Sequence, residues 1–416
     1  MIFSHGLGGS RNAYSHLVGS IASHGVIVIA PEHRDGSAPI SYIRDVPSNN
    51  SISEKASAKR SKRTVDYTRV SHTPSPEVEA SRNAQLKVRL WELGAIHESL
   101  LQLDLGKDLN NLNTSSSSLS VFKGLMDVHT PGKIAFAGHS FGAATVSQLV
   151  KSTFYAPKTA EAPAEYEALF SPSSRSAITS QITPKTPLVL LDMWCMPLRA
   201  ATTRWLWNLP FPCYSSADAP GGEAVLAVES QAFFKWGEHL RATKRFLSPD
   251  PSVTKYDYRR AGQKWTEPNL FYATTSAHLS QSDFGMLFPW VTKKVFGSEE
   301  PERLMKLNVR AILQMLRAQD LEVSSTSAED MESSEIGKEG VETTDDSKIL
   351  ERSRKEVVRG WIWISSDAGE TGNDGDVEKE EEIVEPADAV VGNEIIKERS
   401  GTAEQLSAGG SQGSRL

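Results

Sequence analysis

The residues best suited to chemistry are five consecutive ones, Gly138-His139-Ser140-Phe141-Gly142. A serine in a G-x-S-x-G pattern is typical of a nucleophile held on a sharp turn between a strand and a helix. Both elements are indicated here, because an apolar run (134–137) precedes the turn and helix-forming residues (143–150) follow it. The pattern therefore predicts that Ser140 is a nucleophile rather than an ordinary turn serine.

A serine hydroxyl needs a neighbouring base, usually a histidine oriented by a carboxylate. When such a serine follows a strand in this way, the acid and then the histidine come later in the chain. Of the ten histidines, His239 and His278 lie well after Ser140. His239 falls in a helical pattern and is interpreted as part of a solvated helix face. His278 follows a strand in a loop of small residues, so we expect it to be the base.

Two carboxylates are candidates for the acid, and each directly follows an apolar run. Asp192 ends the run 187–191, and Glu229 ends the run 224–228. Asp192 is favoured because its shorter side chain leaves less freedom in orienting an imidazole, while Glu229 is alternatively a charge in water at a strand end. Asp283 is expected to be the N-cap of a following helix.

Acyl transfer also requires two backbone N–H groups that bind the developing oxyanion. Phe141 follows the nucleophile and starts a helix, so its N–H is one candidate. The other is Leu7, in the glycine-rich loop 5–9 after the first strand. The chain has neither a G-x-G-x-x-G nor a Walker pattern, and no H-E-x-x-H, so we expect no cofactor and no metal.

The elements that must position these residues alternate between strands and helices, which predicts an α/β fold with a mostly parallel sheet and helices on both faces. Ser75 is expected to cap a long amphipathic helix that ends near Leu103. Residues 45–74 are rich in Ser, Lys and Arg and are interpreted as a surface insertion. The expected strands are 1–3, 26–30, 134–137, 187–191, 224–228 and 269–274, and the other expected helices are 13–23, 233–246, 284–296 and 301–317.

Charge divides the 416 residues into two parts. Residues 320–416 carry 25 acidic and 10 basic side chains, a net charge of −15, whereas residues 1–319 carry +8. We therefore expect a catalytic domain over 1–319 and an acidic, largely disordered tail over 320–416. The exception in the tail is the apolar stretch 357–364, which is expected to dock on the domain or bind a partner.

The mean hydropathy is −0.35. The sequence contains no apolar run of 18 residues, so no transmembrane helix is expected, and its N-terminus does not resemble a signal peptide. The two cysteines, Cys195 and Cys213, could pair but do not make a disulfide scaffold. We therefore expect a cytoplasmic protein, with no nucleic acid as partner.

Taken together, these segments resemble the platelet-activating-factor acetylhydrolase family, lipid esterases with the α/β-hydrolase fold. The resemblance spans roughly residues 1–320. It is carried by the segments Phe3-Ser4-His5-Gly6-Leu7-Gly8, Glu32-His33-Arg34-Asp35-Gly36-Ser37, Gly138-His139-Ser140-Phe141-Gly142, Arg89-Leu90-Trp91-Glu92-Leu93, Leu191-Asp192-Met193-Trp194 with Pro197-Leu198, and Ala277-His278 to Asp283-Phe284.

The resemblance implies Ser140 as nucleophile, Asp192 as acid and His278 as base, with Leu7 and Phe141 as oxyanion donors. It also implies calcium-independent hydrolysis of short or oxidised sn-2 acyl groups of glycerophospholipids, possible contact with a membrane surface, and phospholipase A2 activity. Family members have earlier strands, so the N-terminal strands are expected to be missing here. The alternatives are a carboxylesterase for small soluble esters and an inactive homologue that acts through its tail.

The segment 193–214 is rich in apolar and aromatic residues and lies just past the expected acid. Tryptophan is favoured at lipid interfaces and in apolar pockets. Trp194 is therefore a candidate substrate-binding residue, with core packing as the alternative.

Overall fold

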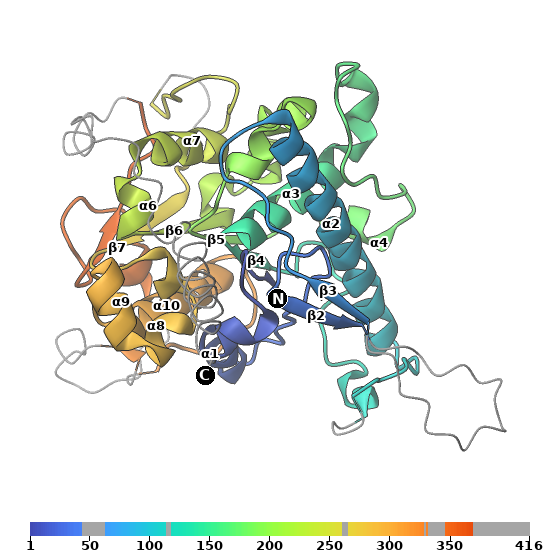
Figure 1. Cartoon of the computed structure of the whole chain (residues 1–416), viewed down its shortest axis with the longest axis horizontal. Coiled ribbons are helices and arrows are strands. Elements are labelled where there is room, and N and C mark those ends of the chain that lie inside the picture. The colour runs from blue at the N-terminus through green and yellow to red at the C-terminus, as the bar shows by residue number, and fades with distance from the viewer. Residues whose placement is uncertain (44–62, 114–117, 260–264, 328–329, 332–345, 369–416) are drawn as a thin grey trace, which may run out of the picture.

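A mostly parallel sheet forms the centre of the molecule (Figure 1). The computed structural model describes residues 1–43, 63–113, 118–259, 265–327, 330–331 and 346–368. Within these residues the strand order is β1-β4-β5-β6-β7-β8; the first five strands are parallel and β8 is antiparallel to β7. The bounds are β1 Ile2–Ser4, β4 Phe136–His139, β5 Leu188–Leu191, β6 Val225–Ser230, β7 Asn269–Ala273 and β8 Trp361–Trp363.

Side chains alternate between the two faces of this sheet, and each face has its own core. Leu188 and Leu190 of β5 belong to one core, while Val189 and Leu191 belong to the other. The first core contains side chains of α2 Pro76–Asp104, α3 Phe141–Tyr155, α4 Ala177–Gln181 and α7 Gly237–Leu247. The second contains side chains of α1 Ser15–Ser23 and α10 Pro301–Ala318. The predicted α/β architecture with helices on both faces is confirmed.

Two expected helices are each divided in two. Residues 231–247 form α6 Gln231–Lys235 and α7, and residues 284–296 form α8 Phe284–Leu287 and α9 Pro289–Phe296. Proline lacks the N–H that would continue a helix, so Pro289 begins α9 instead of extending α8. The short helix α5 Arg204–Trp207 was not expected from the sequence.

The expected strand 26–30 is wrong in extent. These residues make a single bridge beside β1, in which the Phe3 N–H donates to the Ile29 carbonyl at 2.8 Å and the Ile29 N–H donates to the Met1 carbonyl at 2.9 Å. A separate two-stranded antiparallel sheet joins β2 Ile40–Ile43 to β3 Arg63–Asp66. Strand β3 lies inside the expected insertion, of which residues 44–62 are outside the described part.

Helix α2 begins where the sequence predicts, because the Ser75 hydroxyl accepts a hydrogen bond from the Val78 N–H at 3.3 Å. Its buried face differs from the expected apolar stripe. Val88 is exposed, whereas Arg82 and Arg89 are buried at the same helical spacing as the leucines at 86 and 93. This long helix runs beside α3 (Figure 1), and both arginines lie on its buried side.

The expected boundary at residue 319 is also wrong. Strand β8 pairs with β7, and its Trp361 stacks on Phe271 with ring centroids 5.3 Å apart. The Arg310 side chain of α10 forms a buried ion pair with Asp346 at 2.7 Å. Hydrophobic burial outweighs the acidic composition here, so residues 346–368 belong to the domain and the expected docking of the stretch 357–364 is confirmed. Of the expected tail, residues 328–329, 332–345 and 369–416 lie outside the described part.

Candidate active site

Ser140 stands at the sharp turn between β4 and α3, as the G-x-S-x-G pattern predicts. Its backbone has φ 56° and ψ −118°, a conformation that costs a non-glycine residue about 1–3 kcal/mol. Two contacts hold the turn: the Ser140 N–H donates to the Leu191 carbonyl at 2.9 Å, and the Trp194 N–H donates to the Ser140 carbonyl at 3.3 Å. The surrounding sheet therefore maintains the strained serine.

Close backbone approach explains the glycines near this turn. A Cβ on Gly142 would lie 1.9 Å from the carbonyl oxygen of Ser4, so α3 could not pack against β1. A Cβ on Gly6 would lie 3.1 Å from the Cβ of Ser140. The second contact shows that the glycine-rich loop after β1 passes directly beside the serine.

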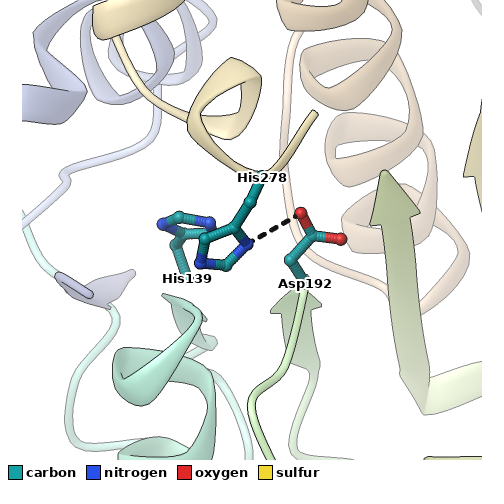
Figure 2. A group of neighbouring side chains, drawn as sticks. All are labelled: His139, Asp192 and His278. Atoms are coloured by element: carbon teal, nitrogen blue, oxygen red, sulfur yellow. Dashed lines mark hydrogen bonds and ion pairs between the residues drawn. The ribbon is translucent and has the colours of Figure 1, made fainter. Parts of the chain in front are cut away.

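Asp192 and His278 come together at the same edge of the sheet (Figure 2). The Asp192 carboxylate accepts a hydrogen bond from Nδ1 of His278 at 3.0 Å and another from the Ser230 N–H at 2.5 Å. The ring of Phe233 stacks on that of His278 with centroids 4.5 Å apart and an interplanar angle of 9°. Since Nδ1 is bonded to Asp192, Nε2 is the nitrogen through which a neutral His278 can accept a proton.

The imidazole of His278 also faces the serine turn. The ring of His139, the residue before Ser140, has its centroid 4.4 Å from that of His278 (Figure 2). The three residues singled out as nucleophile, acid and base are thus gathered at the carboxyl ends of β4, β5 and β7, where ligands bind in parallel α/β sheets.

Glu229 is not a solvated charge at a strand end, so that interpretation is wrong. Its side chain is buried beside Asp192, and burial together with the Asp192 charge raises its pKa well above the ordinary value. Two adjacent buried carboxyl groups cannot both ionise cheaply, so this position favours the neutral form of Glu229, and Asp192 is the group bonded to His278.

His239 is likewise not on a solvated helix face. It is buried, and its Nε2 lies 3.2 Å from the Cys195 backbone N–H and 3.3 Å from the Cys195 Sγ. Burial and the neighbouring His278 and Arg199 lower its pKa to about 3, so its ring is neutral. Both Cys195 and Cys213 are free thiols, so the possible disulfide is not formed.

Tyr14 connects the glycine-rich loop to the serine turn, and nothing in the sequence pattern indicated this. Its hydroxyl accepts a hydrogen bond from the Gly6 N–H at 3.0 Å and lies 2.8 Å from Nδ1 of His139. Burial lowers the pKa of His139 well below its ordinary value, so the ring is neutral and its Nδ1 accepts the single tyrosine proton.

The two expected oxyanion donors lie on elements that meet at Ser140. Phe141 is the first residue of α3, where an N–H has no acceptor within the helix. Leu7 lies between Gly6 and Gly8, whose N–H groups donate to Tyr14 and to the Ser37 carbonyl. The loop conformation at Leu7 is therefore set from both sides.

A second serine–histidine–acid chain starts from Ser4, the last residue of β1. Nε2 of His33 is 2.9 Å from the Ser4 hydroxyl, and its Nδ1 is 2.7 Å from the Glu92 carboxyl group. Ser4 and His33 are completely buried, and Ser4 is within a strand instead of at a turn. This chain satisfies buried polar groups and has no access to a substrate.

Two further expectations concern Trp194 and Asp283. The Trp194 side chain is packed against the ring of Phe141 and under the Arg82 guanidinium, at 6.1 Å and 5.2 Å, so its contact with substrate stays a prediction. Asp283 precedes α8 but does not cap it with its side chain. Its carboxylate instead accepts hydrogen bonds from the N–H groups of Ser15 and His16 and caps α1.

His139, Asp192 and His278 also bring potential metal-ligand atoms within 4.8 Å of one another. Each of these side chains already has a hydrogen-bond partner: Tyr14 for His139, and Asp192 and His278 for each other. These bonds orient the groups for proton transfer.

The parallel sheet with a serine turn after β4 defines the α/β-hydrolase fold. The family described as "Platelet-activating factor acetylhydrolase, isoform II" matches residues 1–337. The chain belongs to this family of hydrolases.

Similar proteins from other organisms agree with this membership. A protein of Schizosaccharomyces pombe named "Putative phospholipase A2" is 26% identical over 347 residues, which cover 77% of this chain and 68% of that protein. The "Platelet-activating factor acetylhydrolase" proteins of Cavia porcellus and Bos taurus are each 37% identical, over 36% of this chain and 30% and 31% of their own lengths. The chain thus matches less than a third of these mammalian relatives.

Among the described helices, none combines the length and the apolar character needed to cross a bilayer.

Proposed function

We propose that this protein is a serine esterase that hydrolyses the sn-2 acetyl, short or oxidised acyl ester of platelet-activating-factor-like glycerophospholipids. The observation that carries the proposal is the Asp192–His278 hydrogen bond of 3.0 Å beside the strained Ser140 turn. Family membership supports an ester of this class, since relatives are named for platelet-activating factor and for phospholipase A2.

In this reaction the Ser140 oxygen attacks the sn-2 carbonyl carbon while Nε2 of His278 takes the hydroxyl proton. Asp192 keeps the imidazole oriented and stabilises its positive charge. The carbonyl electron pair moves to oxygen and returns as the lysophospholipid leaves with the proton from His278. Water, deprotonated by His278, then attacks the acyl-enzyme and releases the carboxylic acid and the free serine.

The negative oxygen of each tetrahedral intermediate would accept hydrogen bonds from the N–H groups of Leu7 and Phe141. Such preorganised donors are worth about 10²–10³-fold each in kcat. Their support in the structure is the start of α3 at Phe141 and the close contact of Gly6 with Ser140.

An exposed apolar surface beside the base loop supports a lipid substrate presented at a membrane surface. Helix η8, His278–Gln281, leads into α8 and α9. Leu287 of α8, Phe288 between the two helices and Trp290 of α9 are 69%, 49% and 70% exposed. Lys294 lies over the Trp290 ring at 4.9 Å. Neighbouring Trp, Leu and Lys side chains are suited to the headgroup region of a bilayer.

The decisive experiment replaces the proposed nucleophile. Ser140→Ala should abolish release of acetate from a 2-acetyl phosphocholine lipid and abolish labelling by a fluorophosphonate. Near-normal turnover by this variant would overturn the assignment, and an unlabelled wild-type protein would favour an inactive homologue. Equal turnover of small soluble esters and the phosphocholine lipid would favour a general carboxylesterase.

The membrane contact is tested separately with two equally exposed tryptophans. Trp290→Ala should weaken binding to vesicles that contain anionic lipid and leave hydrolysis of a soluble ester unchanged. Trp91 on α2 is 69% exposed, so Trp91→Ala is the matched control and should bind vesicles as the wild type does. Equal vesicle binding by both variants would exclude this surface as the lipid contact.

A further inference from the structure

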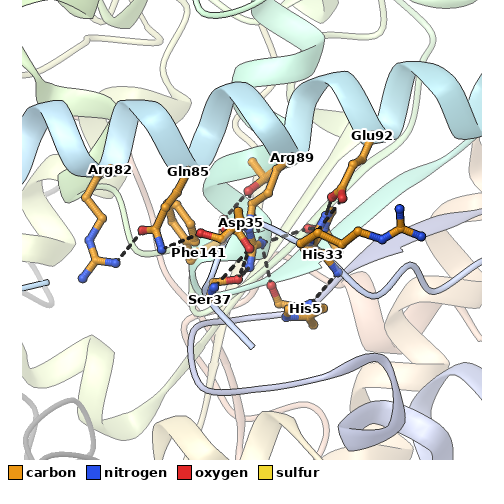
Figure 3. A network of polar contacts seen from close by, with 12 residues as sticks. His5, His33, Asp35, Ser37, Arg82, Gln85, Arg89, Glu92 and Phe141 are labelled. Carbon is orange, nitrogen blue, oxygen red and sulfur yellow. Dashed lines mark hydrogen bonds and ion pairs between the residues drawn. The ribbon is translucent and has the colours of Figure 1, made fainter. Parts of the chain in front are cut away.

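We infer that Arg89, in the middle of α2, is the positioning residue of the oxyanion hole. Its guanidinium holds the His5 carbonyl, directly before Gly6 and Leu7, and also packs on the ring of Phe141 (Figure 3). One side chain therefore connects the two segments that carry the expected oxyanion donors. The inference rests on the proposed function.

On the loop side, the Arg89 guanidinium makes directed hydrogen bonds. Its Nη1 donates to the His5 carbonyl at 2.8 Å, and its Nη2 donates to the Ser37 hydroxyl at 2.5 Å. The Ser37 carbonyl in turn accepts from the Gly8 N–H at 2.8 Å. Arg89 thus holds the loop two residues before Leu7 and, through Ser37, one residue after it.

On the helix side, the guanidinium carbon of Arg89 lies 4.5 Å from the centroid of the Phe141 ring. A planar cation stacks favourably on an aromatic face, and this contact is strengthened where water is excluded. Both side chains are fully buried. The contact sets the distance between α2 and the first residue of α3.

Asp35 supplies the counter-charge that lets Arg89 remain buried. The Asp35 carboxylate accepts from Nε of Arg89 at 2.7 Å and from the Ser37 hydroxyl at 2.5 Å (Figure 3). The Arg89 charge lowers the pKa of Asp35, so the pair is ionised. A lysine would keep the charge but cannot make these three directed contacts at once.

The test compares the same conservative substitution at two buried arginine–aspartate pairs. Arg89→Lys should lower kcat for a short-chain ester by about 10–100-fold with KM changed less than about threefold, because misplacement by 1 Å costs about that much. The Ki of a trifluoromethyl ketone, whose serine adduct carries an oxyanion, should rise in parallel. Arg310→Lys is the matched control: its pair with Asp346 is equally buried, and it should lose thermal stability without losing kcat.

Equal kcat and equal Ki for the two lysine variants would overturn the inference. If Arg89→Lys does not fold, Ser37→Ala decides, because it removes the hydroxyl that joins Arg89 and Asp35 to Ser37, the residue whose backbone carbonyl holds Gly8. Ser41→Ala is the control, because it removes another buried hydroxyl donor. Ser37→Ala should lower kcat about threefold to tenfold relative to this control, and equal kcat values for the two variants would refute the positioning role of Arg89. Failure of the proposed function is distinct, since it would appear as an unlabelled wild-type protein.

Discussion

Adding a single methyl group at Gly142 should separate Ser140, the proposed nucleophile, from the glycine-rich loop that carries the proposed oxyanion donor Leu7. In Gly142→Ala the new Cβ would lie 1.9 Å from the Ser4 carbonyl oxygen and 2.8 Å from that of His5. Carbon–oxygen contacts settle near 3.3 Å, so β1 and α3 would have to move apart by about 1.4 Å. Overpacking of this kind costs about 1–3 kcal/mol or more.

The displacement falls on β1, which leads into the loop with Leu7, and on α3, which directly follows Ser140, so activity should suffer more than stability. A shift of about 1 Å at reacting groups costs roughly 10²-fold in rate. We therefore expect about a 100-fold loss of kcat/KM for p-nitrophenyl acetate and a Tm lower by about 5–10 °C, measured by absorbance and by circular dichroism.

Gly19 provides the control, because it is an exposed position within α1 and an added Cβ there meets nothing within 4 Å. Gly19→Ala should raise stability by about 1 kcal/mol through helix propensity and leave activity unchanged. If Gly142→Ala behaved like Gly19→Ala in both measurements, the close packing of α3 on β1 would not constrain the site.

Three further predictions concern the surroundings of the site. Burial raises the pKa of Glu92 to about 7 from an ordinary 4.5. The stability that this group contributes to the folded protein is therefore complete below about pH 4.5 and is lost as the pH rises through 7. Glu92→Gln should flatten this decline in Tm with pH, and an unchanged pH profile of Tm would refute the prediction. Ser4→Ala leaves a nitrogen of His33 unpaired and should lower the free energy of unfolding, measured by chemical denaturation, by about 1–3 kcal/mol. Fluorophosphonate labelling at Ser140 should persist, and lost labelling would mean that the buried Ser4–His33–Glu92 chain takes part in the reaction. Trp361→Ala should lower the free energy of unfolding by about 3–5 kcal/mol, because the indole is buried and its N–H donates to the Ile349 carbonyl at 2.9 Å. A smaller loss of Tm than that caused by replacing an exposed tryptophan would contradict the placement of β8.

Local rules determined the serine turn from the sequence alone. A strand, a turn and a helix follow one another within residues 134–150, and the atoms that exclude a side chain at Gly138 belong to Gly142 and Ala143, only a few residues further along the chain. The N-cap at Ser75 was predictable for the same reason, since the cap and its helix are neighbours in the chain. His278 is bonded to Asp192 as expected, although its role as base stays a prediction.

Longer-range features could be predicted in part. The buried arginines of α2 occupy the same helical spacing as its buried leucines, so periodicity alone could have indicated that Arg89 faces inward. Nothing in the local sequence of Asp283 reveals that its carboxylate caps α1, 267 and 268 residues away along the chain. The expected cap and the observed one satisfy the same rule at different helices.

The sequence by itself therefore determined the order of the elements and the sharp turn at Ser140, because steric and hydrogen-bonding preferences there act over a few residues. Only the tertiary structure decided that burial beside Asp192 raises the pKa of Glu229, and that His239 is buried against Cys195. It also decided that the segment 346–368 completes the sheet. Protonation and burial depend on which distant side chains meet, and the parallel sheet brings those side chains together.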